Sequence, residues 1–560
     1  MRRLGAAVLV LATACSLPLP SGVHTPSGVK DQGQSAELQV LPPGPTAGQS
    51  QTATVIGFLA AQASPAGDYA IARQFLTGDA VRSWSPATGV RVYLPDTEKV
   101  DLNQNDTSVS VQVRLTTIAT VDRTGHYQVA LGRPNDFSND FYGLTKTLAG
   151  WRISSVPDGV GLQLSQIDLQ RTFAARNIYY LAPQLHPADP RHVVPDRVFL
   201  PAGPALDEAL VRRMMAPASV GLLDSVDGLS APALTVLSVG RSRAGVVTVT
   251  LSDEALGLGT TDLQDLFART VWTLRQDVQF TGLLLRTTRG VLRLAGRPQV
   301  QPATAWQSYD PDGLAADPPY FYVAGHRLHG SISHAALTSG SVRVDHVAVS
   351  PRGDRVAVLG QSTGGQVEVS LGSTRTFGVT RRAVAPGLSS PTWGSGEEGL
   401  WMLQGSDRVV QLGSGSSLQT VSMPGRPAGP ITSLCLSRDG TRAALIIAGT
   451  VYVSRVLWSA GVPSLVDAHP VASSGAPQQV VWSTPTELVV LEVGEQGARA
   501  VQRVAVDGSS PTAVSVGLLT PTAVAAAGTT LIVASGGALY AVAQAVPKRK
   551  AVGTNPVFPG

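Results

Sequence analysis

A repeat in the second half of the chain limits its possible folds more than any other feature. The segments DHVAVSPRGDRVAVL (345–359) and TSLCLSRDGTRAALI (432–446) share the pattern Ser-x-x-Gly-x-Arg between two apolar runs. Two other segments, SPTWGSGEEGLWML and QVVWSTPTELVVL, each place a Trp before a turn and an apolar run. The marker residues alternate at steps of 43, 44 and 45 residues, in the order Ser350, Trp393, Ser437 and Trp482.

A constant step of this length, filled with short strands and Gly-rich turns, is typical of a β-propeller with one four-stranded blade per step. One further step in each direction reaches Trp306 and a strand pair near residue 525. The sequence therefore predicts a propeller of about six blades over 300–545, with five or seven still possible, followed by a C-terminal tail over 546–560. The Ser-x-x-Gly-x-Arg turns, which resemble those of TolB-like propellers, need Gly353 and Gly440 at positive φ.

The segment 51–185 is predicted to be a small α+β domain. Apolar residues have helical spacing over 55–59 and 69–76, and then alternate with polar residues over 108–115, 126–129 and 151–153. Helices followed by a meander of strands give an α+β layout. Together with the closing stretch AGWRISSVPDGVGL, this order resembles the cystatin-like and nuclear-transport-factor-like cones of exported bacterial proteins.

The segment 190–297 is predicted to be a second α+β domain. Its expected elements are a strand at 197–201, a helix at 206–215 ended by Pro217, strands at 234–239 and 245–252, a helix at 261–276 and a strand at 282–286. The stretch VVTVTLSDEALGLGTTDLQDLFARTVWTLRQ resembles the GerM-type domain of exported envelope proteins. That resemblance carries no catalytic residue, and we expect Trp272 and Leu274 in the core. The fold class is therefore multidomain, two small α+β domains followed by an all-β propeller.

The chain begins with a short apolar run that ends at a cysteine. Arg2 and Arg3 precede eleven uncharged residues, Leu4–Ala14, which are too few for a helix that spans a bilayer. The stretch LATAC before and including Cys15 resembles the lipobox of bacterial lipoproteins, although Ala12 stands where Leu is usual. The resemblance implies a signal peptide over 1–14 and a lipidated Cys15. The alternative is an ordinary leader cut elsewhere, with Cys15 incidental.

A flexible tether is predicted between Cys15 and the first domain. Residues 15–50 are rich in Ser, Pro, Gly and Gln, a composition typical of linkers. The second cysteine, Cys435, falls on a predicted propeller strand. There we expect a small buried apolar side chain rather than a reactive thiol, and no disulfide with Cys15.

Motifs that could carry chemistry are weak. Residues 360–364 match the Gly-x-Ser-x-Gly elbow of hydrolases, but 365–371 alternate as a strand, whereas the elbow requires a helix. A hairpin turn is the better interpretation. Four histidines within 21 residues lack the spacing of a zinc site and are expected in solvated loops: His326, His329, His334 and His346.

Charged residues give no catalytic or nucleic-acid site either. Asp253-Glu254 and Glu397-Glu398 are adjacent pairs, and adjacent residues on a strand point to opposite faces. The net charge of +4 comes without a basic stripe interleaved with aromatic residues, so no nucleic-acid partner is expected. The sequence predicts no catalytic, metal-binding or cofactor-binding residue, no cofactor, and a protein that is not an enzyme.

The order of parts over nearly the whole chain resembles the actinobacterial lipoprotein LpqB family, and the GerM-type stretch is the most specific piece. The resemblance implies a lipid anchor at the extracytoplasmic face of the cell membrane. It also implies a partner, the extracellular domain of the sensor histidine kinase MtrB, and a role in two-component signalling for envelope homeostasis and division. The alternatives are a glycan- or ligand-binding propeller of the envelope and an assembly scaffold.

Overall fold

The computed structural model describes residues 42–95, 99–104, 109–130, 137–185, 190–227, 234–315, 317–332, 343–376, 378–394, 399–413, 415–471, 475–543 and 546–560. Residues 42–560 form one compact unit. Cys15, His334 and the pair Glu397-Glu398 lie outside the described residues. Within the described ranges, every helix is too short or too polar to cross a membrane.

The N-terminal domain packs three helices against a sheet. The helices are α1 (Gln51–Ala61), α2 (Ala66–Arg73) and α3 (Ala80–Ser83). The strands are β1 (Val90–Tyr93), β2 (Lys99–Gln104), β3 (Val109–Val121), β4 (Tyr127–Val129), β5 (Phe137–Thr147), β6 (Gly150–Ser155) and β7 (Leu162–Ser165). The main order is β6-β5-β3-β1-β7, and both β2 and β4 pair with β3.

Sequence alternation explains how this domain forms its core. Val111, Val113 and Leu115 on β3 are fully buried, and they pack with Phe58 of α1 and Trp84, which follows α3. The polar residues between them on β3 face outward, as a half-buried strand requires. The predicted α+β layout is therefore confirmed.

The middle domain begins earlier than the sequence suggests. After α4 (Gln166–Thr172), β8 (Phe173–Leu181) pairs along its whole length with β9 (Val193–Pro201). Residues of both strands belong to the core formed with α5 (Leu206–Met215) and α6 (Thr260–Leu274). The remaining strands are β10 (Val236–Arg241), β11 (Val246–Leu251), β12 (Gly282–Thr287), β13 (Gly290–Val291) and β14 (Gln301–Pro302). The stretch 173–181, expected in the first domain, thus belongs to the second.

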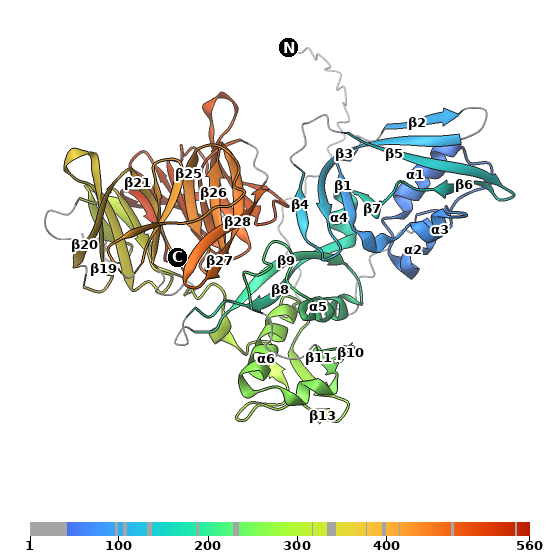
Figure 1. Ribbon diagram of the computed structural model, residues 1–560, viewed down its shortest axis with the longest axis horizontal. Helices are drawn as coiled ribbons and strands as arrows, with labels where there is room; N and C mark the ends of the chain where they lie inside the picture. Colours follow the sequence, from blue (N-terminus) through green and yellow to red (C-terminus); the bar gives the residue numbers. More distant parts are fainter. Residues whose placement is uncertain are drawn as a thin grey trace, which may run out of the picture. The chain divides into compact units, whose positions relative to one another are not determined.

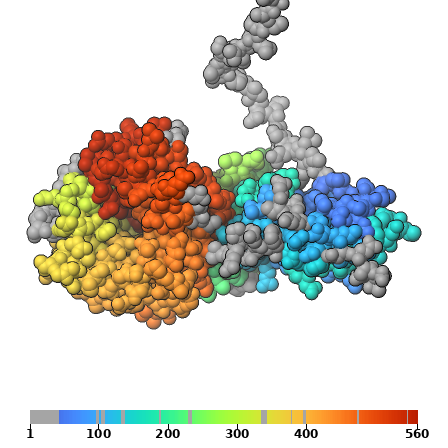
Figure 2. All heavy atoms as spheres, turned by 90° about the horizontal axis from the view of Figure 1, so that it is seen from above, coloured from blue at the N-terminus to red at the C-terminus, as the bar shows by residue number. Residues whose placement is uncertain are grey.

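Six sheets make up the described part of the propeller, and Figures 1 and 2 show their strands and atoms in yellow-green to red. Three strands form the first: β15 (Phe321–Ala324), β16 (Arg327–Gly330) and β37 (Thr554–Val557). The next two sheets are β17 (His346–Val349), β18 (Arg355–Gln361), β19 (Gln366–Ser373) and β20 (Val379–Pro386), then β21 (Leu388–Trp393), β22 (Leu400–Gln404), β23 (Arg408–Leu412) and β24 (Leu418–Thr420). The last three are β25 (Ile431–Leu436), β26 (Arg442–Ile447), β27 (Thr450–Ser459) and β28 (Val462–Val471), then β29 (Ala476–Thr484), β30 (Glu487–Val493), β31 (Arg499–Ala505) and β32 (Thr512–Val514), then β33 (Ala523–Ala527), β34 (Thr530–Ser535), β35 (Ala538–Ala543) and β36 (Val546–Val552).

The inner strands form a closed ring. β17, β21, β25, β29, β33 and β37 are neighbours in that order, and β37 also contacts β17. β37 comes from the C-terminal end of the described chain but pairs with β15 at the start of the propeller. The predicted number of about six blades is confirmed, and the last strand of the chain closes the ring.

Two expectations about the ends of the propeller are wrong. Residues 546–560 were expected as a tail, but they contain the outer strand β36 and the inner strand β37. Trp306 has the spacing of a blade marker, yet it lies in the core of the middle domain, stacked on Phe267 with ring centroids 6.4 Å apart. Since β14 pairs with β12, the middle domain extends past residue 300.

The shared turns owe their shape to one serine each. Gly353 and Gly440 have φ of 71° and 70°, as the sequence predicts. In the second turn the Ser437 hydroxyl donates to Asp439 at 2.6 Å and accepts from the Arg442 amide at 3.1 Å. The motif is therefore a structural turn that joins the inner strand of a blade to the second strand of the same blade.

Candidate functional site

The ring of inner strands surrounds a cavity of about 320 Å³. All six inner strands contribute to its lining, with polar side chains such as His346, Thr392, Ser433, Gln479 and Asn555. We call this cavity the channel. Cys435 also lines it, as a free and partly buried cysteine, and burial raises the pKa of its thiol.

Most of these polar side chains are already used to join neighbouring blades. Thr392 Oγ1 accepts a hydrogen bond from the Leu436 amide at 2.9 Å, and Ser433 Oγ accepts one from the Val480 amide at 3.3 Å. The amide group of Gln479 binds both the N–H and the C=O of Val524, at 2.9 and 3.1 Å. Asn555 donates to the Asp345 carbonyl at 2.7 Å. These bonds fix the ring, so the polar lining serves the fold.

Arg438 is the charged group of the channel. Its side chain is 5 % exposed. It donates to the carbonyls of Pro559, Ser483 and Ala526 at 2.9, 3.3 and 3.1 Å. It also pairs with Asp312 at 3.3 Å. Burial lowers the pKa of Arg438 and raises the pKa of Asp312 to about 6.

Arg438 also lines a second cavity of about 240 Å³, which we call the cleft. The cleft lies between the end of β8, the linker residues 308–313 and the turn residues 351–352. Its charged groups have both signs: Arg191, Asp227, Asp310, Asp312, Arg352 and Arg438. Mixed charges beside several prolines suit the binding of a polar ligand or peptide more than a reaction.

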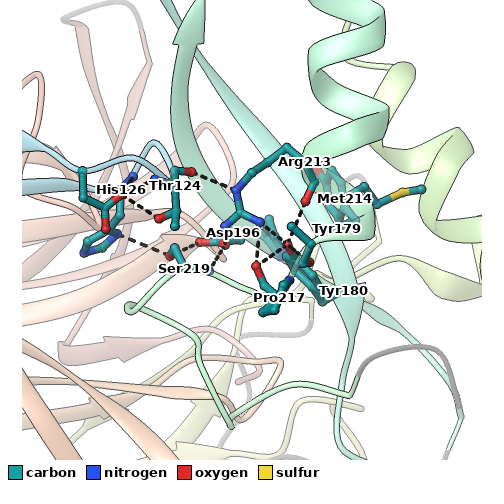
Figure 3. Close-up of polar contacts among 12 residues, drawn as sticks. Thr124, His126, Tyr179, Tyr180, Asp196, Arg213, Met214, Pro217 and Ser219 are labelled. Atoms are coloured by element: carbon teal, nitrogen blue, oxygen red, sulfur yellow. Dashed lines mark hydrogen bonds and ion pairs between the residues drawn. The ribbon is translucent and has the colours of Figure 1, made fainter. Parts of the chain in front are cut away.

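A buried carboxylate and an arginine lie where the middle domain meets the N-terminal domain (Figure 3). Asp196 on β9 is 2 % exposed. It accepts two hydrogen bonds from Ser219, from the hydroxyl at 2.6 Å and from the amide at 2.7 Å. Arg213 lies 3.6 Å from the same carboxylate and donates to the carbonyls of Thr124 and Pro217 at 2.8 and 2.6 Å. Because Thr124 precedes β4, the Arg213 guanidinium links the two domains.

Polar contacts also join these domains to the propeller. Arg442, which is 2 % exposed, donates to the carbonyl of Pro485 at 2.7 Å and to that of Pro195. Arg197 pairs with Asp507 at 3.1 Å.

Two histidines meet at the same junction. The rings of His126 and His469 meet nearly perpendicularly, with centroids 6.0 Å apart. Burial, and then the nearby charges of His126 and Arg442, lower the pKa of His469 to about 4.

The structure separates the residues that the sequence singles out. Residues 362–365 connect β18, which contains Gly360 and Gln361, to the antiparallel strand β19, which confirms the hairpin. His326 pairs with Asp345 at 3.0 Å, whereas His329 stacks on Tyr322 at 5.3 Å. In the part of the chain that the structure describes, no three metal-ligating side chains come together. Trp272 and Leu274 are buried, 5 % and 0 % exposed, as expected.

The buried arginines were missed by sequence reasoning. Arg442 is the last residue of the repeated turn, but its counterpart in the first turn, Arg355, is exposed. Arg438 stands inside the turn, at the place that Pro351 has in the first turn, and so is no part of the repeated pattern. The motif marks the turn, while burial of its arginine depends on what packs against each blade.

Comparisons with known proteins agree on one family. The model of the lipoprotein LpqB N-terminal domain matches residues 44–168, and that of the lipoprotein LpqB β-propeller domain matches 332–559. A lipoprotein LpqB of Thermobifida fusca is 28% identical, over 100% of this chain and 99% of the relative. One of Mycobacterium tuberculosis is 29% identical, over 92% of this chain and 93% of the relative.

Solved structures are less similar to this chain than these relatives are. TolB from Acinetobacter baumannii is 11% identical, covers 54% of this chain and 85% of its own, and has a TM-score of 0.35.

Proposed function

The chain belongs to the lipoprotein LpqB family, and on that premise we propose that it is a lipid-anchored protein that binds the sensor domain of a histidine kinase. The sensor domain that it binds is the extracellular domain of the kinase, and binding modulates two-component signalling in envelope homeostasis and division. The observation that carries this proposal is the match to lipoprotein relatives over 92% to 100% of the chain.

The anchor is assigned to Cys15. The short apolar run and the following tether support cleavage before this residue and attachment of a diacylglycerol to its sulfur. The anchor would hold the folded unit at the extracytoplasmic face of the cell membrane, where the sensor domain of a kinase is also exposed.

Binding rather than catalysis is supported by how the polar groups are used. Channel side chains such as Thr392 and Ser433 make bonds between blades, and Arg438 is surrounded by backbone carbonyls. Ser219 Oγ lies 3.4 Å from His126 Nδ1, but Ser219 is fully buried, so a substrate could not reach this hydroxyl as it would reach a nucleophile. We therefore infer that the protein acts through its surface.

Metabolic labelling with an alkyne fatty acid tests the anchor. Cells expressing the wild-type chain should give a labelled band that partitions into detergent. The Cys15→Ala variant should give none, and a Cys435→Ala variant serves as the matched control that keeps its label. A labelled Cys15→Ala chain would exclude this anchor.

Affinity capture tests the partner. The purified chain is immobilised and exposed to the extracellular domain of the MtrB-type kinase, with the extracellular domain of an unrelated kinase as control. We expect selective retention of the first at micromolar concentration. Equal retention of both domains, or of neither, would contradict the proposal.

A second candidate function is the binding of a small envelope ligand, favoured by the cleft of about 240 Å³. Soluble cell-wall glycan fragments would be tested by the shift in the melting temperature. Stabilisation of the wild-type chain but not of an Arg191→Ala variant would place the ligand in the cleft. No shift with either chain would count against this candidate.

A further inference from the structure

The outer strand of the last blade carries an unpaired run of positive charge. β36 is at the edge of its sheet and pairs only with β35. Lys548, Arg549 and Lys550 on this strand are all exposed. No Asp or Glu occurs between residues 508 and 560. Within the described chain, none of the three cations has a hydrogen-bond or ion-pair partner, so their charge is directed to the solvent.

Exposed aliphatic side chains flank these cations. Val546 and Val552 at the two ends of β36 are 70% and 64% exposed, and Leu518 is fully exposed. Leu518 belongs to a loop that reaches the start of β36, since a Cβ added to the neighbouring Gly517 would lie 3.4 Å from Pro547 Cγ. We call the surface formed by Leu518, Val546, Lys548, Arg549, Lys550 and Val552 the β36 edge. Apolar groups so exposed beside cations point to a partner that is both anionic and apolar.

Protection of the sheet edge explains only part of this surface. Charged residues on an outer strand prevent pairing with another molecule. The outer strands β24 (Leu418–Thr420) and β32 (Thr512–Val514) carry no charge, however, β28 (Val462–Val471) carries a single carboxylate, Asp467, and β20 carries two cations instead of three, Arg381 and Arg382. Edge protection also gives no reason for Leu518 to project fully into solvent. Three consecutive cations beside exposed aliphatic groups therefore need another explanation.

We propose that the β36 edge binds the surface of a bilayer that contains anionic phospholipids. β36 meets the bilayer with its free edge, so that the long side chains of Lys548, Arg549 and Lys550 reach the lipid phosphates from both faces of the strand. Leu518 and Val546 enter the boundary between headgroups and acyl chains, and this combination is typical of proteins that lie on membranes. A tether anchored at Cys15 would leave the folded unit free to rotate, and this second contact would fix which side of the propeller faces the membrane. The proposal rests on the surface of blade six and does not depend on kinase binding.

Vesicle sedimentation tests the proposal on the full chain carrying Cys15→Ala, which lacks an acyl group. The vesicles are phosphatidylcholine alone, or phosphatidylcholine with about 30 mol% phosphatidylglycerol. The parent should bind the anionic vesicles, more weakly in high salt, and should bind the neutral vesicles little. Lys548→Glu with Lys550→Glu should lower the partition coefficient at least about 30-fold, because each cation near an anionic surface contributes about fivefold. Leu518→Ser should lower it roughly tenfold.

The matched control is Arg381→Glu with Arg382→Glu on β20, an outer strand of another blade with two exposed arginines. It changes the net charge by the same amount, and the uncleaved leader is common to all variants. Circular dichroism and melting confirm that each variant is folded. The control should bind nearly as well as the parent.

Three results would overturn the proposal. An equal loss of vesicle binding from the charge reversal on β36 and from the one on β20 would mean that only the net charge of the protein matters. Unchanged binding after reversal at Lys548 and Lys550 would exclude the β36 edge. Charge-dependent binding to soluble polyphosphate without binding to anionic vesicles would assign the edge to an anionic polymer instead of a membrane.

Discussion

Replacing Phe558 by Ala tests whether the end of the chain closes the propeller. Phe558 follows β37, is 5 % exposed, and packs edge-on against Tyr320 with ring centroids 6.0 Å apart. The same cluster includes Ile532 of β34 and Leu539 of β35. This side chain thus joins the first and last blades. Removing a buried Phe side chain costs about 3–5 kcal/mol, and we expect a value near the middle of that range.

A second substitution at the entry to β37 should act by the opposite mechanism. A Cβ on Gly553 would lie 2.5 Å from Tyr322 Cδ2 and 2.9 Å from the Val323 carbonyl oxygen. The backbone oxygen cannot move away without breaking the pairing of β15 and β37. Gly553→Ala should therefore destabilise the propeller by about 1–3 kcal/mol through overpacking.

The assay is chemical unfolding followed by the fluorescence of the propeller tryptophans, with calorimetry to separate the domain transitions. Val552→Ala is the control, since Val552 is 64% exposed on β36 and should change stability by less than about 0.5 kcal/mol. If Phe558→Ala unfolds at the same denaturant concentration as Val552→Ala, residues 554–560 do not close the ring and the account of the fold fails.

Three further predictions concern titration and thiols. The pKa of His469, about 4, lies below the ordinary 6.5, so the folded state binds protons less readily than the unfolded chain and the free energy of unfolding should fall by about 3 kcal/mol from pH 7 to pH 4. In urea unfolding at the two pH values, His469→Gln should remove this loss. An equal fall in the free energy of unfolding for the wild-type and the variant chain would contradict the prediction. The effect of Asp312 has the opposite sign: its pKa of about 6 lies above 3.8, so the free energy of unfolding should fall by about 2 kcal/mol as the pH rises from 4 to 7, and Asp312→Asn should flatten that slope. Finally, denatured protein from the membrane fraction should titrate one thiol, Cys435, if Cys15 is acylated; two thiols would refute the anchor.

The number of blades could be predicted because each blade repeats the same local sequence. Serine and tryptophan markers recur near the ends of four inner strands, β17, β21, β25 and β29, and Gly353 and Gly440 adopt the expected positive φ. The two ends of the ring lack that local signal. The Trp272 indole donates to the Trp306 carbonyl at 2.9 Å, so Trp306 is held by the middle domain despite its spacing. The pairing of Phe321 with Val557 joins residues far apart in the sequence, which no local pattern reveals.

The candidate sites were less predictable than the fold. Both cavities exist because separate segments converge, and Arg438 lines the two of them. The first turn has Pro351 at the place of Arg438, and Arg438 is held by carbonyls of two other blades. Likewise, the role of Asp196 depends on Ser219 and Arg213. The placement of buried charge therefore needs the three-dimensional structure.

Crosslinking in intact cells tests the central claim most directly. A photoreactive amino acid is placed at several exposed positions of the lipidated wild-type chain, and crosslinked proteins are identified by mass spectrometry. The account predicts that the extracellular domain of a sensor histidine kinase is enriched over a control in which the photoreactive amino acid is placed at a buried position of the same lipidated chain. A full set of crosslinked partners that contains no sensor kinase, from a chain shown to be at the membrane, would contradict it.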